Sequence, residues 1–243
     1  MILNIMSSNP TTAIEMPLEN EAPLEIVRMP AARRLKLSVD PRSGAVKLVM
    51  PKRAALGPAL EWVKGQQGWI SAQLAKLPDP WPIAPDMMVP FAGQQLRLDW
   101  SPQHSVLPRC VDDRIVMGGA EDMITARLLR WLRREAVKTL TAETREIARA
   151  AGISVAKIGV GDPRSRWGSC ASNGDIRYSW RLILAPAFVR RATVAHEVAH
   201  RVHMNHSPAF HAQVQLLFGE DPAQARHWLR HNGARLHWFG RDV

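Results

Sequence analysis

Two histidines on either side of a glutamate are the residues best suited to chemistry in this sequence, in the stretch His196-Glu197-Val198-Ala199-His200. Histidines four residues apart on a helix lie about one turn from each other, so both imidazoles can bind one metal ion. The glutamate would then lie beside that ion. This H-E-x-x-H pattern is typical of zinc sites in which the metal activates a water and the glutamate removes its proton. We therefore predict His196 and His200 as metal ligands and Glu197 as the general base.

A third ligand is expected from the turn that follows this helix. His206 lies ten residues after His196, within the stretch Asn205-His206-Ser207-Pro208. Asparagine tolerates a left-handed turn, and Ser-Pro can cap and begin a new helix. The chain can therefore stop, reverse and bring His206 back to the ion. Three protein ligands would leave the fourth tetrahedral position open for water, as in catalytic zinc sites.

Two other residues compete for the place of third ligand. His203 lies seven residues after His196, but its imidazole would lie about a turn past His200 and point away from a shared ion, so we expect a surface or supporting role. Glu220 lies 20 residues after His200, a separation that resembles thermolysin-like peptidases. It sits in a Gly-Glu-Asp-Pro stretch that predicts a helix stop and a new cap. We favour His206, with Glu220 as the main competitor.

The elements that must position these residues can be traced along the sequence. Pro186 suits the start of a helix, and small apolar residues then recur at roughly helical spacing. Before it, residues 167–170 and 176–184 flank Asn173-Gly174, which predicts a hairpin. Its second strand runs directly towards the metal-binding helix. We expect residues 176–180 to pair with an extended peptide and to hold a carbonyl near the metal.

Several blocks of the sequence, in order, resemble the YgjP-like metallopeptidases, which are relatives of the SprT-like and WLM-type zincins. The blocks are RSRWGSC at residues 164–170, GDI at 174–176, WRL at 180–182, LAP at 184–186, HEVAH at 196–200 and NHS at 205–207. The resemblance extends over most of residues 25 to 240. It implies a zinc-dependent hydrolase acting on peptide bonds, with metal ligands at His196, His200 and His206 and a catalytic role for Glu197.

Peptide hydrolysis also requires a group that stabilises the developing oxyanion. Tyr178 and Arg166 are candidates for this substrate-binding role, although the sequence does not place either of them. Cys170 belongs to the same block as Arg166, but we expect both cysteines, Cys110 and Cys170, to be reduced and partly buried thiols.

The pattern along the chain predicts an α+β fold, with a zincin-like catalytic part in which the H-E-x-x-H helix packs on a small mixed sheet. Residues 1–24 read as a flexible tail. Residues 25–118 form a β-rich N-terminal part, with a hairpin over 35–50, a helix over 60–77 and short strands near 89–91, 95–98, 105–107 and 114–117. Residues 119–243 form the catalytic part, which begins with a long helix over 121–151.

Composition narrows the protein's class and surroundings. A hydrophobic content of 46% over 243 residues permits a substantial core. The first residues are too short an apolar run for a signal peptide, and no stretch approaches the length needed to span a membrane. We therefore expect a cytoplasmic protein that acts on peptide or protein substrates without a membrane partner.

The positive charge is distributed unevenly. The formal net charge is +10, and residues 121–243 hold 19 Lys+Arg against 11 Asp+Glu. Arg127, Arg130, Arg133 and Arg134 fit the solvated face of an amphipathic helix. A basic C-terminal half can also attract nucleic acid. Two alternatives to a simple peptidase therefore stay open, namely a DNA-associated protease and a non-catalytic, zinc-stabilised nucleic-acid-binding module.

Overall fold

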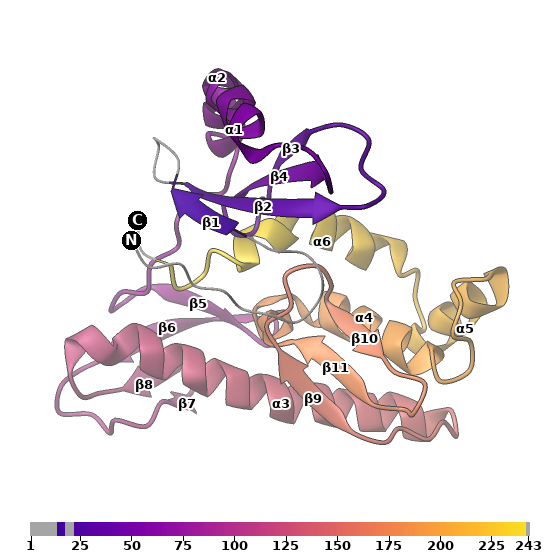
Figure 1. Cartoon of the computed structure of the whole chain (residues 1–243). Coiled ribbons are helices and arrows are strands. Elements are labelled where there is room, and N and C mark those ends of the chain that lie inside the picture. Colours follow the sequence, from indigo (N-terminus) through magenta and orange to yellow (C-terminus); the bar gives the residue numbers. More distant parts are fainter. Residues whose placement is uncertain (1–13, 18–21, 242–243) are drawn as a thin grey trace. The chain divides into compact units, whose positions relative to one another are not determined.

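The chain divides into two compact units, Met1–Asp79 and Pro80–Val243. A computed structural model describes residues 14–17 and 22–241, and Figure 1 labels its elements. Most of the predicted flexible tail lies outside the described residues. Ile14–Pro17, within that tail, forms strand β1 and pairs antiparallel with β2.

The first unit contains a mixed four-stranded sheet, in the order β1-β2-β4-β3, and two helices. The predicted hairpin is confirmed, because β3 and β4 pair antiparallel with Leu37 opposite Leu48. The helix predicted over residues 60–77 is instead two helices, since the chain breaks at Gly65 and Gln66. The core of this unit lies between the sheet and the helices. The elements after β1 are β2 (Pro23–Met29), β3 (Lys36–Val39), β4 (Val46–Pro51), α1 (Leu56–Lys64) and α2 (Gln67–Leu74).

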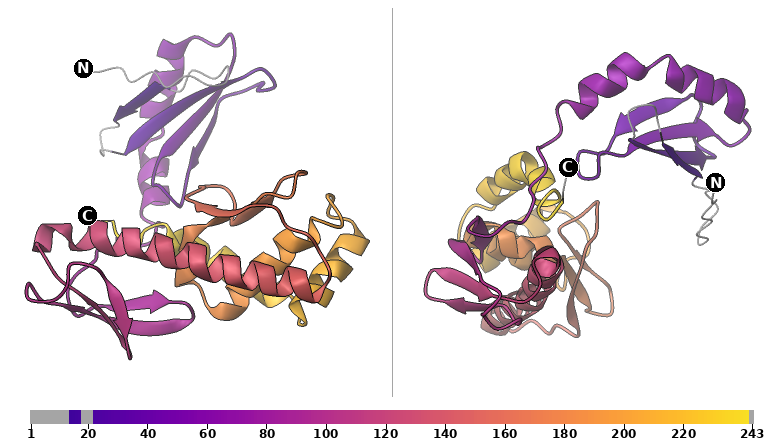
Figure 2. Two further views of the ribbon diagram at one scale, coloured as in Figure 1. Left: turned by 90° about the horizontal axis from the view of Figure 1, so that it is seen from below. Right: turned by 90° about the vertical axis from the view of Figure 1, so that its left-hand side faces the viewer.

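The second unit is organised along one long helix, α3 (Ile124–Ala150), which runs past two sheets (Figures 1 and 2). The first sheet has the order β5-β6-β8-β7. Three of its strands match the predictions. The prediction of a strand at residues 105–107 is wrong, because the strand in this region, β7, begins two residues later in the sequence. Residues 88–117, which the sequence groups with the N-terminal part, share their apolar core with α3. The strands are β5 (Met88–Phe91), β6 (Gln94–Trp100), β7 (Arg109–Val111) and β8 (Arg114–Met117).

The second sheet of this unit has three strands in the order β10-β11-β9. Strand β11 (Ile176–Ser179) pairs antiparallel with β10 (Gly168–Cys170) and parallel with β9 (Ile158–Gly161). The hairpin predicted around Gly174 is therefore confirmed. The expectation that residues 176–180 offer a free edge is wrong, because β11 is paired on both sides. The edge strands are β10 and β9.

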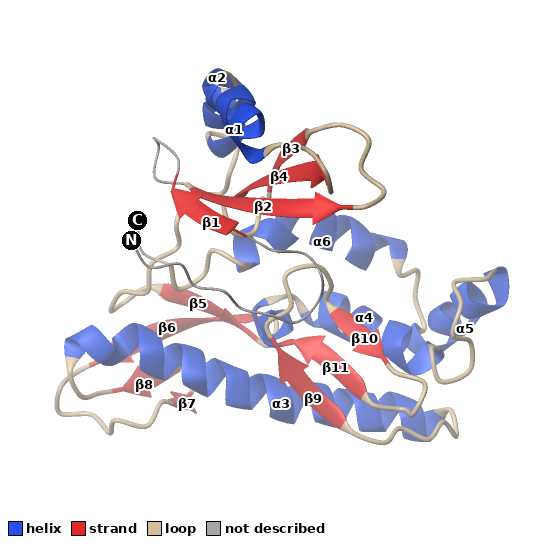
Figure 3. Cartoon of the chain, viewed as in Figure 1, coloured by secondary structure: helices blue, strands red, loops and turns tan. Residues whose placement is uncertain are grey.

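Three further helices complete the unit, and Figure 3 distinguishes the helices from the strands by colour. A short 3-10 helix at Trp180–Leu184 leads from β11 into α4 (Ala187–Ala199), which α5 (Pro208–Phe218) and α6 (Ala223–Leu236) follow. The predicted α+β class is thus confirmed. Among the described residues, no helix has the length and apolar character needed to span a membrane.

A buried ion pair fixes α4 against α3. Arg190 Nη2 lies 2.8 Å from Glu143 Oε1, and both side chains are almost fully excluded from solvent. Arg190 Nη1 is buried without a hydrogen-bond partner in the described part of the chain. One turn further along, Arg191 and Glu146 form a second pair between the same two helices, at 2.9 Å and largely exposed. The orientation of α4 therefore depends on charged contacts with α3 as well as on apolar packing.

Candidate metal centre

The end of α4 and the turn after it carry the three predicted ligands. His196 lies in the last turn of α4, and His200 is the residue that caps its C-terminus. The chain then reverses, and Ser207 caps the next helix, where its Oγ accepts a hydrogen bond from the backbone N–H of Phe210 at 3.4 Å. This cap, which the Ser-Pro sequence predicts, begins α5 immediately after His206 and returns its imidazole to the other two.

The spacing of the three imidazoles suits one metal ion. His196 Nε2 and His206 Nε2 are 3.3 Å apart, and one ring nitrogen from each of the three histidines lies within 4.8 Å of the others. Tetrahedral bonds of zinc to histidine nitrogen, at about 2.0–2.1 Å, would hold two nitrogens about 3.3–3.4 Å apart. The residues present therefore fit a metal ion, with neutral nitrogen ligands from His196, His200 and His206.

The two other candidates for the third ligand, His203 and Glu220, do not join the cluster of imidazoles. His203 contributes its backbone carbonyl, which accepts a hydrogen bond from His200 Nδ1 at 3.0 Å. This contact orients the His200 ring and leaves Nε2 for a metal, an arrangement common around metal-binding histidines. Glu220 is exposed in the turn after α5 and lies outside the histidine cluster.

Burial favours the neutral form of two of the imidazoles, those of His196 and His200. It lowers the pKa of His196 to about 4, and the neighbouring His200 and His206 add to this effect. Burial also lowers the pKa of His200. Because a metal binds the neutral form of histidine, these environments favour binding near neutral pH.

Glu197 lies beside His196 in a tight, buried position. Its side chain is 5% exposed, and burial raises its pKa to about 7, against the opposing charge of Arg166. The carboxylate lies against the backbone of β10, where a Cβ added at Gly168 would approach Glu197 Cδ and Cγ to 2.7 Å. Only glycine leaves this space free. Sequence reasoning missed this role, because the glycine of the RSRWGSC block does not reveal the residue it faces.

A cavity of about 260 Å³ opens beside His196 and Glu197. Its walls come from the start of β10 and from α4, α5 and α6, and they are mainly apolar, with Trp167 and Leu229 among them. Arg166 and Arg226 also line it, and both are exposed. Neither arginine side chain forms a salt bridge or hydrogen bond within residues 14–17 and 22–241. The cavity therefore offers a mainly apolar interior with two exposed cations at its border.

The two predicted substrate-binding residues have different outcomes. Arg166 lies at the cavity, close enough to Glu197 for its charge to act on that carboxylate. Tyr178 is fully buried, and its hydroxyl lies 3.0 Å from Thr144 Oγ1 in a hydrogen bond with α3. The assignment of Tyr178 to substrate binding is therefore corrected, because its side chain points into the core and its hydroxyl is already engaged.

Phe210, an apolar residue of α5, packs against all three histidines. Its ring is fully buried, and its centroid lies 4.4 Å from that of His200, 4.7 Å from His206 and 4.9 Å from His196. The position three residues after a helix cap is the only signal of this role. Such a contact restricts the rotation of the imidazoles before a metal binds.

One of three comparisons with known proteins identifies a family for this chain. No curated protein and no solved structure matches the chain significantly. A family model described as "YgjP-like, metallopeptidase domain" matches residues 33–232, which include the whole histidine cluster, Glu197 and the strand that faces it. The chain belongs to the YgjP-like metallopeptidase family.

Proposed function

We propose that this protein is a zinc-dependent peptidase, with His196, His200 and His206 as ligands and Glu197 as the general base. The observation that carries the proposal is the convergence of three imidazoles beside a buried carboxylate, at the mouth of a cavity. Family membership supports metal-dependent hydrolysis. The three-histidine set supports zinc, which favours nitrogen ligands in tetrahedral geometry.

Each residue has a distinct part in the proposed reaction. Zinc, when bound, supplies a Lewis acid that lowers the pKa of a water ligand to about 7 and polarises the scissile carbonyl. Glu197 accepts the proton of the attacking water and then donates it to the leaving amine. Arg166 provides a cation beside Glu197, and we assign it to binding the substrate near the reacting carbonyl.

Strand β10 is the element we assign to holding the peptide. It is one of the two edge strands of its sheet, and it contacts α4, the helix that carries the histidines, whereas the other edge strand, β9, contacts α3. An extended peptide can pair with such an edge through its main chain. Because Gly168 of this strand lies against Glu197, a peptide paired along β10 would pass close to the general base.

The proposal is tested by comparing metal content and peptide hydrolysis in the same preparations. A zinc-loaded protein is expected to cleave a mixed peptide library, to lose activity with a chelator and to regain it with zinc. Glu197→Gln should keep its zinc and lose turnover by about 10²–10⁴-fold, the usual contribution of a general base. A Glu197→Gln protein that cleaves as fast as the wild type would contradict the assigned mechanism.

A further inference from the structure

A second cavity, of about 500 Å³, lies on the β10-β11-β9 sheet next to the proposed active site. Its lining includes Lys157, Arg166 and Arg177 as cations, together with Ser169 and Asp175. We name this cavity the outer groove. Arg166 borders both the outer groove and the 260 Å³ cavity beside Glu197, so the two cavities adjoin each other.

The strand register places the outer groove on the opposite face of β10 from the general base. Ser169 pairs with Arg177, which in turn pairs with Gly159, so these three residues share one face of the sheet. No atom lies within 4 Å of the position that a Cβ at Gly159 would occupy, so this part of the face is open. Gly168, the next residue to Ser169, faces Glu197 on the other side.

The charge of the outer groove is unbalanced. Three cations line it, and Asp175 is the one acidic residue among the lining residues. Asp175 is held by Asn173, whose Nδ2 donates to Asp175 Oδ2 at 3.2 Å. In the described part of the chain, the side chains of Lys157, Arg166 and Arg177 form no salt bridge or hydrogen bond. The charge of Arg166 also acts on Glu197. The exposed guanidinium group of Arg177 is suited to binding a carboxylate.

An extended peptide along β10 would use both cavities. Successive side chains of a strand point to opposite faces. One side chain of the peptide would therefore enter the mainly apolar cavity beside Glu197, and its neighbour would turn over the outer groove. The alternation of glycine and serine at positions 168 and 169 follows the same two directions.

From this arrangement we propose that the outer groove is a substrate subsite for an acidic side chain, with Arg177 as its main specificity residue. The favoured substrate is an extended peptide in which an aspartate or glutamate is next to an apolar residue. This inference rests on the proposed peptidase function, because it places the peptide along β10. It names a class of substrate that hydrolysis alone does not define.

The test is peptide binding to the full-length, zinc-loaded Glu197→Gln protein, so that substrate is not consumed. Two labelled peptides differ only in glutamate or glutamine next to a leucine, and fluorescence anisotropy gives both dissociation constants. We expect the glutamate peptide to bind about tenfold more tightly, the effect of one additional charged hydrogen bond. The same measurements at a higher salt concentration should give a smaller difference between the two dissociation constants.

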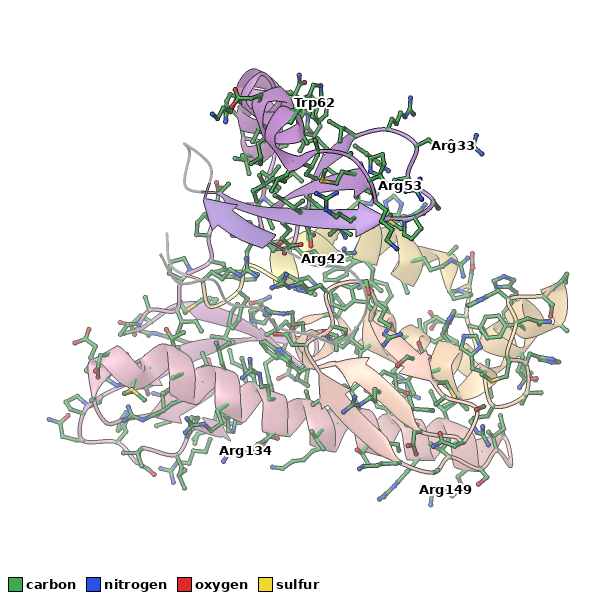
Figure 4. All side chains as sticks on the ribbon, in the orientation of Figure 1. Arg33, Arg42, Arg53, Trp62, Arg134 and Arg149 are labelled. Carbon is green, nitrogen blue, oxygen red and sulfur yellow. The ribbon has the colours of Figure 1, made fainter. Side chains whose placement is uncertain are left out.

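Matched arginine variants locate the effect. Arg177→Gln should remove the preference for glutamate, whereas Arg134→Gln should keep it, because Arg134 is an exposed residue of α3 that points into solvent (Figure 4). Equal affinity for the two peptides, or an unchanged preference in Arg177→Gln, would overturn the proposal. So would an oligonucleotide that binds through Arg177 when the acidic peptide does not, since this would assign the groove to nucleic acid.

Hydrolysis by the wild type separates this inference from the proposed function. Cleavage of both peptides with equal kcat/KM would contradict the proposed acidic subsite and would still support the proposed peptidase function. A failure to cleave any peptide, with glutamate-dependent binding retained, would remove the peptidase and leave the groove as a site for acidic peptides.

Discussion

Two helices of this protein carry histidines four residues apart, with different results. His196 and His200 on α4 converge with His206 into a three-nitrogen cluster. On α6, the rings of His227 and His231 lie even closer, with centroids 4.1 Å apart, yet both are exposed and no third ligand joins them among the described residues. His231 Nδ1 donates to the backbone carbonyl of His227 at 2.9 Å. Helical spacing therefore brings two imidazoles together, but it does not by itself create a metal site.

The difference lies in what surrounds each pair. Around the α4 pair, the turn before α5 returns His206, and Phe210 packs against all three rings. Glu197 is buried beside them against Gly168. Around the α6 pair, no third histidine, cysteine or carboxylate completes a ligand group in the described part of the chain. A site thus depends on the elements behind the ligands, and each of these elements can be altered separately.

The largest expected effect comes from the ion pairs that hold α4 on α3. Glu143→Gln should leave Arg190 charged, buried and unpaired, and it should lower the free energy of unfolding by about 3–5 kcal/mol. Glu146→Gln is the matched control, because its pair with Arg191 is exposed to solvent and should contribute much less to the free energy of unfolding. Urea unfolding of the two variants measures both. Equal losses would show that burial does not distinguish these contacts.

The next effect comes from the space beside Glu197. Gly168→Ala should displace the carboxylate and reduce turnover about 100-fold, as misplacement by about 1 Å does in other enzymes, while zinc content stays unchanged. Gly161→Ala is the control on the same sheet, since its nearest neighbour would be an ordinary contact at 3.9 Å. Steady-state kinetics and metal analysis provide the two readouts. Loss of zinc in Gly168→Ala would mean that the strand supports the ligands as well as the base.

The smallest effect is expected from the ring behind the histidines. Phe210→Leu should weaken zinc binding about tenfold, at the lower end of the losses seen when residues that orient metal ligands are changed. Competition with a zinc-binding dye measures the dissociation constant. Phe188→Leu, at a partly exposed position on the same helix as His196, should leave it unaffected. An unchanged constant in Phe210→Leu would remove Phe210 from our account of the site.

Much of the site is encoded in short stretches of sequence. The spacing of His196 and His200 and the Ser-Pro cap after His206 depend on local helix geometry, so they can be predicted without a fold. The position of Tyr178 cannot, because the face to which a strand residue points depends on which neighbours the sheet acquires. Which strand lies at the edge of the sheet could not be predicted either. The pairing of β9 with β11 joins residues about 18 positions apart in the sequence.

Partners from distant elements were the hardest to predict. Gly168 meets Glu197 only because β10 lies along α4. The grouping of residues 88–117 with the N-terminal part followed their pattern of short strands, whereas these strands pack into the core built around α3. Periodicity identifies which residues are buried, but it does not identify what they are buried against.

The most direct test of the metal centre is elemental analysis of zinc per chain in untagged wild type, His206→Ala and His231→Ala. We predict about one zinc in the wild type and in His231→Ala, and almost none in His206→Ala, because loss of one of three protein ligands leaves an incomplete tetrahedral site. Glu220→Ala should retain zinc. Zinc retained in His206→Ala, or lost in Glu220→Ala, would contradict the assignment of the three histidines.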